Sequence, residues 1–343
     1  MKSMIRNVIS GASIPFLIRN YLRKWMVYGG IIATICCLGA CSNERSSDRN
    51  STDYKQQILQ QLIDVINEVP GTVGVAVVSD SDTILINNGV RFPMMSVFKL
   101  HQALAVCNRL EACDQSLDTI LNIKSGELDT HTWSPELKRY IGKEFSISVA
   151  DLIRYAVVSS DNNASNLLFR HIISPEATDG YIRSVANDTT FRIMYSEDDM
   201  SVDHSRAYAN FTSPLSAALL IRKVFQTASD DKSAPSAEET LKISSDKLRA
   251  VREALLTVTT GHDRLGAPLH DKDGIVFGHK TGSGYRNRND ELAAFNDVGY
   301  IQLPSGKNYA IAVLIRDFHG SEAEAAEIIA SISSIVFEKE AEG

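Results

Sequence analysis

The stretch Phe92-Pro93-Met94-Met95-Ser96-Val97-Phe98-Lys99 decides how this sequence is interpreted, because it places a lysine three residues after a serine. In a helix, residues three apart lie on the same face, so the two side chains can meet. A serine hydroxyl becomes an effective nucleophile when a neighbouring base takes its proton. The pattern therefore predicts that Ser96 is a catalytic nucleophile and that Lys99, buried beside it, has a lowered pKa suited to proton transfer.

Two more fragments, Ser160-Asp161-Asn162 and Lys280-Thr281-Gly282, follow further along the chain. Each fragment alone carries little information, since a Ser-x-x-Lys arises by chance in a chain of this length and Ser-Asp-Asn is a common turn sequence. All three in this order are the pattern of class A β-lactamases and penicillin-binding proteins. Together they predict a serine hydrolase that works through an acyl-enzyme.

Longer segments around these fragments extend the resemblance, namely Ser160-Asp161-Asn162-Asn163-Ala164-Ser165-Asn166 and His279-Lys280-Thr281-Gly282-Ser283-Gly284. With them the sequence resembles the class A serine β-lactamases from about residue 54 to residue 338. Met200 and the segment Asn296-Asp297-Val298-Gly299 are similar to the CfxA-type cephalosporinase branch of that family. The resemblance implies hydrolysis of the β-lactam amide of penicillins and cephalosporins, and thereby antibiotic resistance.

The resemblance implies separate roles for the residues of the second fragment. Ser160 would relay a proton to the leaving nitrogen of the substrate. Asn162 would form hydrogen bonds to Lys99 and to the amide of the substrate's side chain. Asn166 would have a structural role, because in the family this position holds the loop that carries the hydrolytic base.

The third fragment is expected to bind the charged groups of the substrate. Lys280 would supply a positive potential for the substrate carboxylate, and the hydroxyl groups of Thr281 and Ser283 would bind it directly. The backbone N–H groups of Ser96 and Ser283 would form an oxyanion hole, which stabilises the charge that develops during acyl transfer.

Glu197 is the expected hydrolytic base, in the segment Ser196-Glu197-Asp198-Asp199-Met200-Ser201, which is predicted to be a loop. The family carries a Glu-x-x-Leu-Asn pattern here. Met200 is an apolar substitute for the leucine, whereas Ser201 departs from the asparagine that helps to hold the hydrolytic water. The alternative is a solvated acidic loop, and whether Glu197 also acts in acylation stays open at this point.

Two further positions are expected at the substrate cleft. Trp133, before Ser134-Pro135, matches an aromatic residue at the rim, although it would also fit an ordinary core. Arg264 resembles an arginine that reaches the substrate carboxylate from a neighbouring element, and Arg286 and Arg288 are the alternatives for that task. The eight histidines show no metal-binding spacing and no glycine-rich phosphate loop occurs, so neither a metal nor another cofactor is expected.

The remaining pattern predicts an α+β fold of the serine β-lactamase and DD-peptidase type. The expected elements are, in order, a helix over 54–69, strands over 72–78 and 83–87, a mainly helical region over 96–256, strands over 292–303 and 309–317, and a helix over 321–338. An antiparallel sheet flanked by the two terminal helices would then form one discontinuous domain, residues 54–95 and 257–343. A helical domain, residues 96–256, would be inserted into it, with the active site in the cleft between them.

The N-terminus is predicted to be an export signal. Residues 1–40 contain five basic and no acidic side chains, and the uncharged stretch 25–38 is too short to span a bilayer but typical of a signal sequence. Leu38-Gly39-Ala40-Cys41 is similar to a lipobox, in which Cys41 would be lipidated; ordinary cleavage near Ala40 is the alternative. Residues 41–53 would be a polar tether, and the protein would be periplasmic and anchored to the membrane only through that lipid.

Export implies an oxidising compartment. Cys36 and Cys37 would leave with the signal and Cys41 would carry lipid, so Cys107 and Cys113 remain. These two residues could form a disulfide or remain two buried thiols.

The composition of the 343 residues, 44% hydrophobic and 22% charged, is typical of a folded globular protein. The formal net charge of −7 argues against a nucleic-acid partner, and a monomer that binds β-lactam small molecules is expected. Two alternatives share the acylation chemistry: a penicillin-binding DD-peptidase, and a β-lactam sensor that is acylated once. Glu197 and the small size argue against the first, and the single N-terminal apolar stretch argues against the second.

Overall fold

The computed structural model describes residues 45–186, 188–226 and 236–342. The predicted signal, residues 1–40, and the predicted lipidation site Cys41 lie outside these ranges. Contacts group Thr52–Gly343 into one compact unit and Met1–Ser51, of which residues 45–51 are described, into another. In the described part of the chain, no helix has both the length and the apolar character that crossing a bilayer requires.

A five-stranded sheet with the order β2-β1-β9-β8-β7 forms the centre of the larger unit, and every neighbouring pair is antiparallel. The strands are β1 Thr72–Ser79, β2 Thr83–Ile86, β7 Val276–Ser283, β8 Leu292–Gln302 and β9 Asn308–Phe318. This confirms the two hairpins predicted from sequence. The hairpin near the N-terminus joins the late strands through β1 and β9, which pair from Thr72 with Arg316 to Ser79 with Tyr309.

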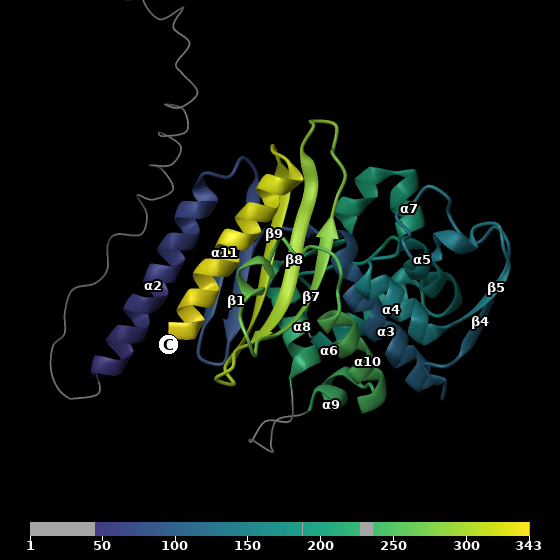
Figure 1. Ribbon diagram of the computed structural model, residues 1–343, viewed down its shortest axis with the longest axis horizontal. Helices are drawn as coiled ribbons and strands as arrows, with labels where there is room; N and C mark the ends of the chain where they lie inside the picture. Colours follow the sequence, from purple (N-terminus) through teal and green to yellow (C-terminus); the bar gives the residue numbers. More distant parts are fainter. Residues whose placement is uncertain (1–44, 187, 227–235, 343) are drawn as a thin grey trace, which may run out of the picture. The chain divides into compact units, whose positions relative to one another are not determined.

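The two terminal helices of the larger unit cover one face of the sheet, as Figure 1 shows for α11 (Glu322–Glu342) and for the part of α2 (Arg45–Asn67) that begins at Thr52. Side chains alternate between the two faces of a strand. Val73, Val75 and Val77 of β1 accordingly join the hydrophobic cluster of α2 and α11, whereas Ala76 and Val78 join the cluster of the helical region. The α+β fold with flanking terminal helices is therefore as predicted.

The helix α8 (Pro214–Phe225) packs on the other face, against β1, β8 and β9. The sheet presents small side chains here, including Ala310 and Ala312 of β9. Gly74 of β1 also has no side chain on this face, where a Cβ would lie only 2.7 Å from Cγ of Pro214 in α8. Small residues on this face therefore let the helical region approach the sheet closely.

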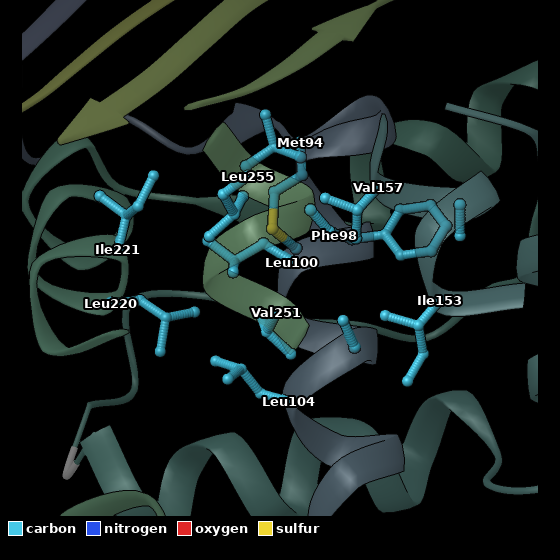
Figure 2. Packing of buried hydrophobic residues seen from close by; sticks show 14 of the residues in the cluster. Met94, Phe98, Leu100, Leu104, Ile153, Val157, Leu220, Ile221, Val251 and Leu255 are labelled. Atoms are coloured by element: carbon cyan, nitrogen blue, oxygen red, sulfur yellow. The ribbon is translucent and has the colours of Figure 1, made fainter. Parts of the chain in front are cut away.

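The region between the two parts of the sheet is mainly helical, as expected. Its longer helices are α3 Phe98–Ala112, α4 Val149–Val158, α5 Asn162–His171, α6 Pro175–Ala186, α8 and α10 Ser245–Leu256. Shorter elements are η1 Met95–Val97, η2 Leu137–Tyr140, α7 Glu197–Val202, η3 His204–Ala209, α9 Ala237–Leu241, η4 Ala267–Leu269 and the strand pairs β3 Phe92–Pro93 with β6 Phe211–Thr212 and β4 Ile120–Ile123 with β5 Phe145–Ser148. Figure 2 shows side chains from α3, α4, α8 and α10 meeting in one core around Leu100 and Leu104.

Two local details differ from the sequence-based expectation. Helix α2 begins at Arg45, so the segment 45–53 of the predicted tether is helical. The segment after Ser196 is the short helix α7 and not a loop, because Ser196 caps it: its Oγ accepts from the Asp199 N–H, and the Asp199 carboxylate accepts from the Ser196 N–H in return. Such a capping box satisfies two donors that a helix start otherwise leaves unpaired.

The two cysteines of the described chain are free thiols in different surroundings. Cys107 is buried in α3, whereas Cys113, directly after the end of that helix, is exposed. Neither sequence-based alternative is therefore correct. Burial raises the pKa of the Cys107 thiol to about 12.

We predict that brief alkylation of the native protein at pH 8 modifies Cys113 and leaves Cys107 unmodified. The thiolate is the reactive form, and burial both excludes the reagent and keeps Cys107 protonated. Mass spectrometry of the digested protein measures the two sites, and the same treatment in denaturant should modify both. Label on native Cys107, or a peptide pair cross-linked through these two residues, would contradict the structure.

Candidate active site

One cavity of about 1010 Å³ brings together most of the residues selected from the sequence. Eight of them line it: Ser96, Trp133, Ser160, Asn162, Glu197, Arg264, Thr281 and Ser283. Lys99 and Lys280 are fully buried next to it, with 0% of their surface exposed. These residues come from α3, α5, α7, β7 and the segments between them, so the site joins the helical region to the edge of the sheet.

The predicted nucleophile Ser96 lies in the short helix η1, which continues directly into α3. Met95 just before it has a φ of 46°, a left-handed conformation that is unfavourable for a residue with a side chain. Asn296 of β8 holds this segment in place, because its Nδ2 donates to the carbonyl oxygens of Pro93 and Met94 at 2.8 and 3.2 Å. The sheet therefore fixes the position of Ser96.

Lys99 makes three polar contacts with its ammonium group. Nζ donates to the carbonyl oxygen of Ser160 at 2.8 Å and to Oδ1 of Asn162 at 2.5 Å, and it lies 3.0 Å from Oε1 of Glu197. Burial lowers the pKa of Lys99, although the negative charge of Glu197 opposes this change. An ammonium has three N–H donors, so these contacts satisfy all of them.

Glu197 is the first residue of α7 and contacts both partners of the Ser-x-x-Lys fragment. Its Oε1 accepts a hydrogen bond from Oγ of Ser96 at 3.4 Å as well as contacting Lys99. The partner that the structure gives to the Ser96 hydroxyl is thus Glu197 and not Lys99. A carboxylate here can take a proton from the serine or from a water molecule bound beside it.

Asn166 holds α7 against the helical region, as its expected structural role requires. Its Nδ2 donates to Oδ1 of Asp198 at 2.6 Å, and its Oδ1 accepts from the Asp198 backbone N–H at 3.2 Å. Arg170, one turn further along α5, forms an ion pair with the other carboxylate oxygen of Asp198. Asp198 is therefore an anchor for the helix that carries Glu197, a role that sequence reasoning missed.

Ser160 has a left-handed backbone with a φ of 56°, and the following Asp161 explains how this conformation is held. The fully buried Asp161 carboxylate accepts hydrogen bonds from Ser134 Oγ and from the backbone N–H groups of Glu136 and Leu137. Its Oδ1 also caps α5 at Ala164. Asp161 thus fixes the segment that positions Ser160 on one side and Asn162 on the other.

Asn162 makes one of its two expected contacts within the protein. Its Oδ1 accepts from Lys99, and its Nδ2 donates to Oγ1 of Thr132 at 2.8 Å. Thr132, which also lines the cavity, was not predicted. It fixes the side-chain orientation of Asn162, so that the amide edge of Asn162 borders the cavity.

Lys280 connects the second and third fragments. Its Nζ donates to Oγ of Ser160 at 3.1 Å and to the carbonyl oxygen of Thr281 at 3.0 Å. Burial places the pKa of Lys280 well below its usual value, and the nearby charge of Lys99 lowers it further. Lys280 thus sits where it can exchange a proton with the Ser160 hydroxyl.

Gly282 explains why the third fragment contains a glycine. A Cβ at this position would lie 2.4 Å from the carbonyl oxygen of Met94 and 3.1 Å from the backbone N of Val97. Without a side chain, β7 can run directly alongside the segment that carries Ser96. The same approach brings the backbone of Ser283 to the cavity, where the sequence predicted the second oxyanion donor.

Arg264 lies at the end of the cavity next to β7, whereas Arg286 and Arg288 do not line this cavity. Its Nη1 donates to the carbonyl oxygen of Asn296 and its Nη2 to Oγ of Ser283, both at 2.7 Å. Its Nε is buried without a hydrogen-bond partner. The guanidinium is therefore held against β8 and Ser283, and adds positive charge beside Lys280.

The two remaining predicted positions lie at the edges of the cavity. Thr281 Oγ1 is 2.6 Å from Oγ1 of Thr260, another cavity residue that the sequence did not reveal. Trp133 is 61% exposed, so it belongs to the rim and not to the core. Its Nε1 donates to the carbonyl oxygen of Ser159 at 3.1 Å, which holds the ring beside Ser160.

Comparison with known proteins gives one consistent family. The model of the β-lactamase enzyme family matches residues 56–339. A β-lactamase of Phocaeicola vulgatus is 43% identical over 281 residues, which cover 82% of this chain and 84% of that protein. The extended-spectrum β-lactamase PER-1 of Pseudomonas aeruginosa is 32% identical over 284 residues, which cover 82% of this chain and 86% of that protein.

Solved structures agree with these sequence relatives. A class A β-lactamase from Bacteroides cellulosilyticus superposes with a TM-score of 0.76 at 28% identity and covers 84% of this chain and 99% of its own. The TLA-3 extended-spectrum β-lactamase superposes with a TM-score of 0.75 at 29% identity and covers 83% of this chain and 98% of its own.

We predict that Gly282→Ala lowers the free energy of unfolding by about 1–3 kcal/mol, because the added methyl group meets backbone atoms that cannot move aside like a flexible side chain. Gly180→Ala is the matched control. Gly180 lies in α6 with no atom within 4 Å of its would-be Cβ, so alanine should stabilise the helix by about 0.5–1 kcal/mol. Urea unfolding measures both variants, and an unchanged stability of Gly282→Ala would show that β7 and the Ser96 segment are not tightly packed.

Proposed function

We propose how the site carries out the reaction of its family, since this chain belongs to the β-lactamase enzyme family and is a class A serine β-lactamase. The protein hydrolyses the β-lactam amide through an acyl-enzyme and thereby confers resistance to the antibiotic. The observation that best supports our assignment of roles is that Oε1 of Glu197 lies 3.4 Å from Oγ of Ser96 and 3.0 Å from Nζ of Lys99.

In the acylation step, Oγ of Ser96 attacks the β-lactam carbonyl carbon as its proton passes to Glu197. The backbone N–H groups of Ser96 and Ser283 stabilise the oxyanion that forms. The C–N bond then breaks, and the leaving nitrogen takes a proton from Ser160 Oγ, which Lys280 replenishes across the 3.1 Å hydrogen bond. The product is an ester of Ser96 with an opened ring.

Glu197 is favoured over Lys99 as the base for Ser96. All three ammonium donors of Lys99 have acceptors, so no lone pair on Nζ faces the serine hydroxyl. The lowered pKa of Lys99 lets it exchange a proton with Glu197, its closest charged neighbour. In this assignment Lys99 organises Glu197, Asn162 and Ser160 around the nucleophile.

Before deacylation, Glu197 gives up the proton that it took from Ser96 and Lys280 regains the proton that it gave to Ser160, so that acylation as a whole moves one proton from Ser96 to the leaving nitrogen. In the deacylation step, the Glu197 carboxylate takes a proton from a water molecule that attacks the ester carbon. The C–O bond to Ser96 then breaks, and Glu197 returns this proton to Oγ of Ser96. Ser201 replaces the asparagine of the family pattern, and its Oγ donates to the carbonyl oxygen of Asp198 at 2.8 Å. Ser201 also lines the cavity, so its hydroxyl oxygen is positioned to accept a hydrogen bond from the water.

The substrate carboxylate is expected at the end of the cavity lined by Thr281 and Arg264, next to the buried Lys280, where positive charge is concentrated. The acyl side chain then points towards the other end, past Asn162 and α7. Since every proposed catalytic group comes from the same chain, a monomer suffices for the reaction.

A penicillin-binding DD-peptidase or a β-lactam sensor would be acylated by a β-lactam but would hydrolyse the resulting acyl-enzyme only slowly. Glu197 beside Ser96 supports hydrolysis instead, because a carboxylate at this position can activate water on the ester.

We predict that Glu197→Gln folds normally, accumulates an acyl-enzyme with good substrates, and loses steady-state turnover by at least about 10²-fold, the lower end of a general-base contribution. The amide can fill the space of the carboxylate but cannot take a proton from Ser96 or from water. Without the negative charge of Glu197 the pKa of Lys99 falls further, so neutral Lys99 replaces Glu197 as the base for Ser96 and acylation continues at a lower rate. Deacylation slows more than acylation, so the adduct accumulates. Intact-mass analysis detects the trapped adduct, and peptide mapping should place it on Ser96. A label on Ser160 would overturn the assignment of the nucleophile.

Asp199→Asn is the matched control for this experiment, two residues away in the same helix. Asp199 accepts hydrogen bonds from Ser196, and an asparagine oxygen can accept them too, so turnover should stay within about tenfold of the wild type. If Asp199→Asn trapped the adduct and Glu197→Gln did not, the base would have been placed wrongly by two residues.

We further propose that the protein is exported and anchored as a lipoprotein through Cys41. The support is the lipobox-like Leu38-Gly39-Ala40-Cys41 in the sequence, since these residues lie outside the described part of the structure.

Cells fed labelled palmitate should yield a labelled protein, and the Cys41→Ala variant should lose the label. The lipid is attached to the cysteine sulfur, so no other residue can replace it. Gel fluorography after fractionation measures both label and membrane association. A soluble, unlabelled wild-type protein would instead indicate ordinary cleavage near Ala40.

A further inference from the structure

A fully buried carboxylate, Asp297 of β8, lies behind the positively charged end of the catalytic cavity. None of its surface is exposed, and it is not among the residues that line that cavity. It belongs to the segment Asn296-Asp297-Val298-Gly299, in which Asn296 holds the segment before Ser96. Asp297 takes part in no step of the proposed reaction. Since burying a carboxylate is unfavourable unless it is paired and hydrogen-bonded, its partners indicate its role.

Two neighbouring segments fix the orientation of the Asp297 carboxylate. The backbone N–H of Leu265 donates to Oδ2 at 3.2 Å, which ties the residue after Arg264 to β8. Nδ1 of His279 lies 3.0 Å from Oδ1 and 3.2 Å from Oδ2, and because an ionised carboxylate can only accept, Nδ1 is the donor. The His279 ring is itself stacked on Phe277, with ring centroids 4.4 Å apart. The carboxylate is therefore held both from β7 and from the segment that carries Arg264.

The register of the sheet places Asp297 next to Lys280. In the antiparallel pair of β7 and β8, Asp297 lies opposite Thr281, and Val298 lies opposite Lys280. Burial is the main cause of the lowered pKa of Lys280, the charge of Lys99 lowers this pKa further, and the negative charge of Asp297 is the strongest influence that opposes them. Asp297 therefore favours the ammonium form of Lys280.

Glu197, the other negative charge that acts on Lys280, cannot take over this role. It lies 3.0 Å from Nζ of Lys99, and in the proposed reaction it takes up and gives up a proton in each step. Asp297 keeps its charge throughout, because it exchanges no proton in that reaction. It also lies outside the cavity, so the front of the cationic end stays open to the substrate carboxylate.

Asp297 has the same effect on Arg264, the second cation at this end of the cavity. Burial lowers the pKa of Arg264, and Asp297 is the strongest of three carboxylates that oppose this change, ahead of Asp263 and Glu322. Asp263 and Glu322 are both exposed, so solvent and salt screen their charges, whereas a buried charge is screened much less. The charge of Arg264 also acts against the ammonium form of Lys280, so two like charges share one buried counter-charge.

We propose that Asp297 is a positioning residue for the hydrolysis: acting through Lys280 and Arg264, it keeps the carboxylate-binding end of the cavity positively charged before the substrate arrives. His279 and Leu265 hold the carboxylate in place for this task. This role rests on the proposed function, in which Lys280 must be an ammonium to attract the ring carboxylate of the substrate and to return a proton to Ser160. A counter-charge behind the cations stabilises them without competing with the substrate for the cavity.

The test measures the pH dependence of kcat/KM for one cephalosporin in Asp297→Asn. Asparagine keeps an oxygen that accepts from Leu265 and His279 but removes the negative charge. Without that charge Lys280 loses its proton at a lower pH, so the alkaline limb of the profile should move to lower pH by about one unit, the lower end of the effect of a nearby opposite charge. On the acid side of both midpoints kcat/KM should stay within about threefold of the wild type, and on the alkaline side it should fall about tenfold.

Asp297→Ser is the second variant, because a hydroxyl is also an uncharged acceptor but fills less space. The alkaline limb should move by the same amount in both variants, since both remove the same charge. Asp273→Asn is the matched control, in which the same substitution is made at an exposed residue shortly before β7, and its profile should equal that of the wild type. An unchanged limb in either folded Asp297 variant, or an equal shift in Asp273→Asn, would overturn the role of Asp297. Failure of the proposed function would be visible separately, because the wild type would then not hydrolyse the cephalosporin at any pH.

Discussion

The burial of two lysines is the constraint on which the site depends. A fully buried ammonium costs several kcal/mol unless its donors find acceptors. Lys99 finds them in α7 and the segment around Ser160, and Lys280 of β7 finds one in Ser160 Oγ. The helical region and the sheet must therefore meet at the ends of the Lys99 and Lys280 side chains. Because the two lysines lie close together, the positive charge of Lys99 repels that of Lys280 and helps to lower the pKa of Lys280.

Two residues with strained backbones lie close to the buried lysines, and a buried polar side chain holds each of them in place. Met95 and Ser160 both adopt left-handed backbone conformations, which cost of order 1–3 kcal/mol each for residues with side chains. Asn296 holds the carbonyl groups before Ser96, and Asp161 holds the segment after Ser160. Such strain persists only where the surroundings fix it, so the rigidity of Asn296 and Asp161 is a requirement of the catalytic geometry.

Short-range patterns predicted most of the fold, and long-range contacts account for what was missed. The hairpins, the terminal helices and the three fragments follow from neighbouring residues, and α7 could have been predicted from the capping pattern of Ser196 and Asp199. Asn296, in contrast, acts on residues 202 and 203 positions away, and Thr132 acts on a residue 30 positions away. Nothing near either residue signals its partner, because the contact exists only after the sheet and the helical region have come together.

The order of charges along the catalytic cavity gives the substrate a direction. Positive charge from Lys280 and Arg264 lies at one end, and the negative charge of Glu197 lies beside Ser96. A carboxylate placed near Ser96 would meet Glu197 at short range, and like charges in a cleft of reduced dielectric repel strongly. An anionic substrate is therefore most stable with its carboxylate at the Lys280 and Arg264 end and its neutral carbonyl at Ser96. Repulsion by Glu197 thus favours the same substrate orientation as attraction by Lys280 and Arg264.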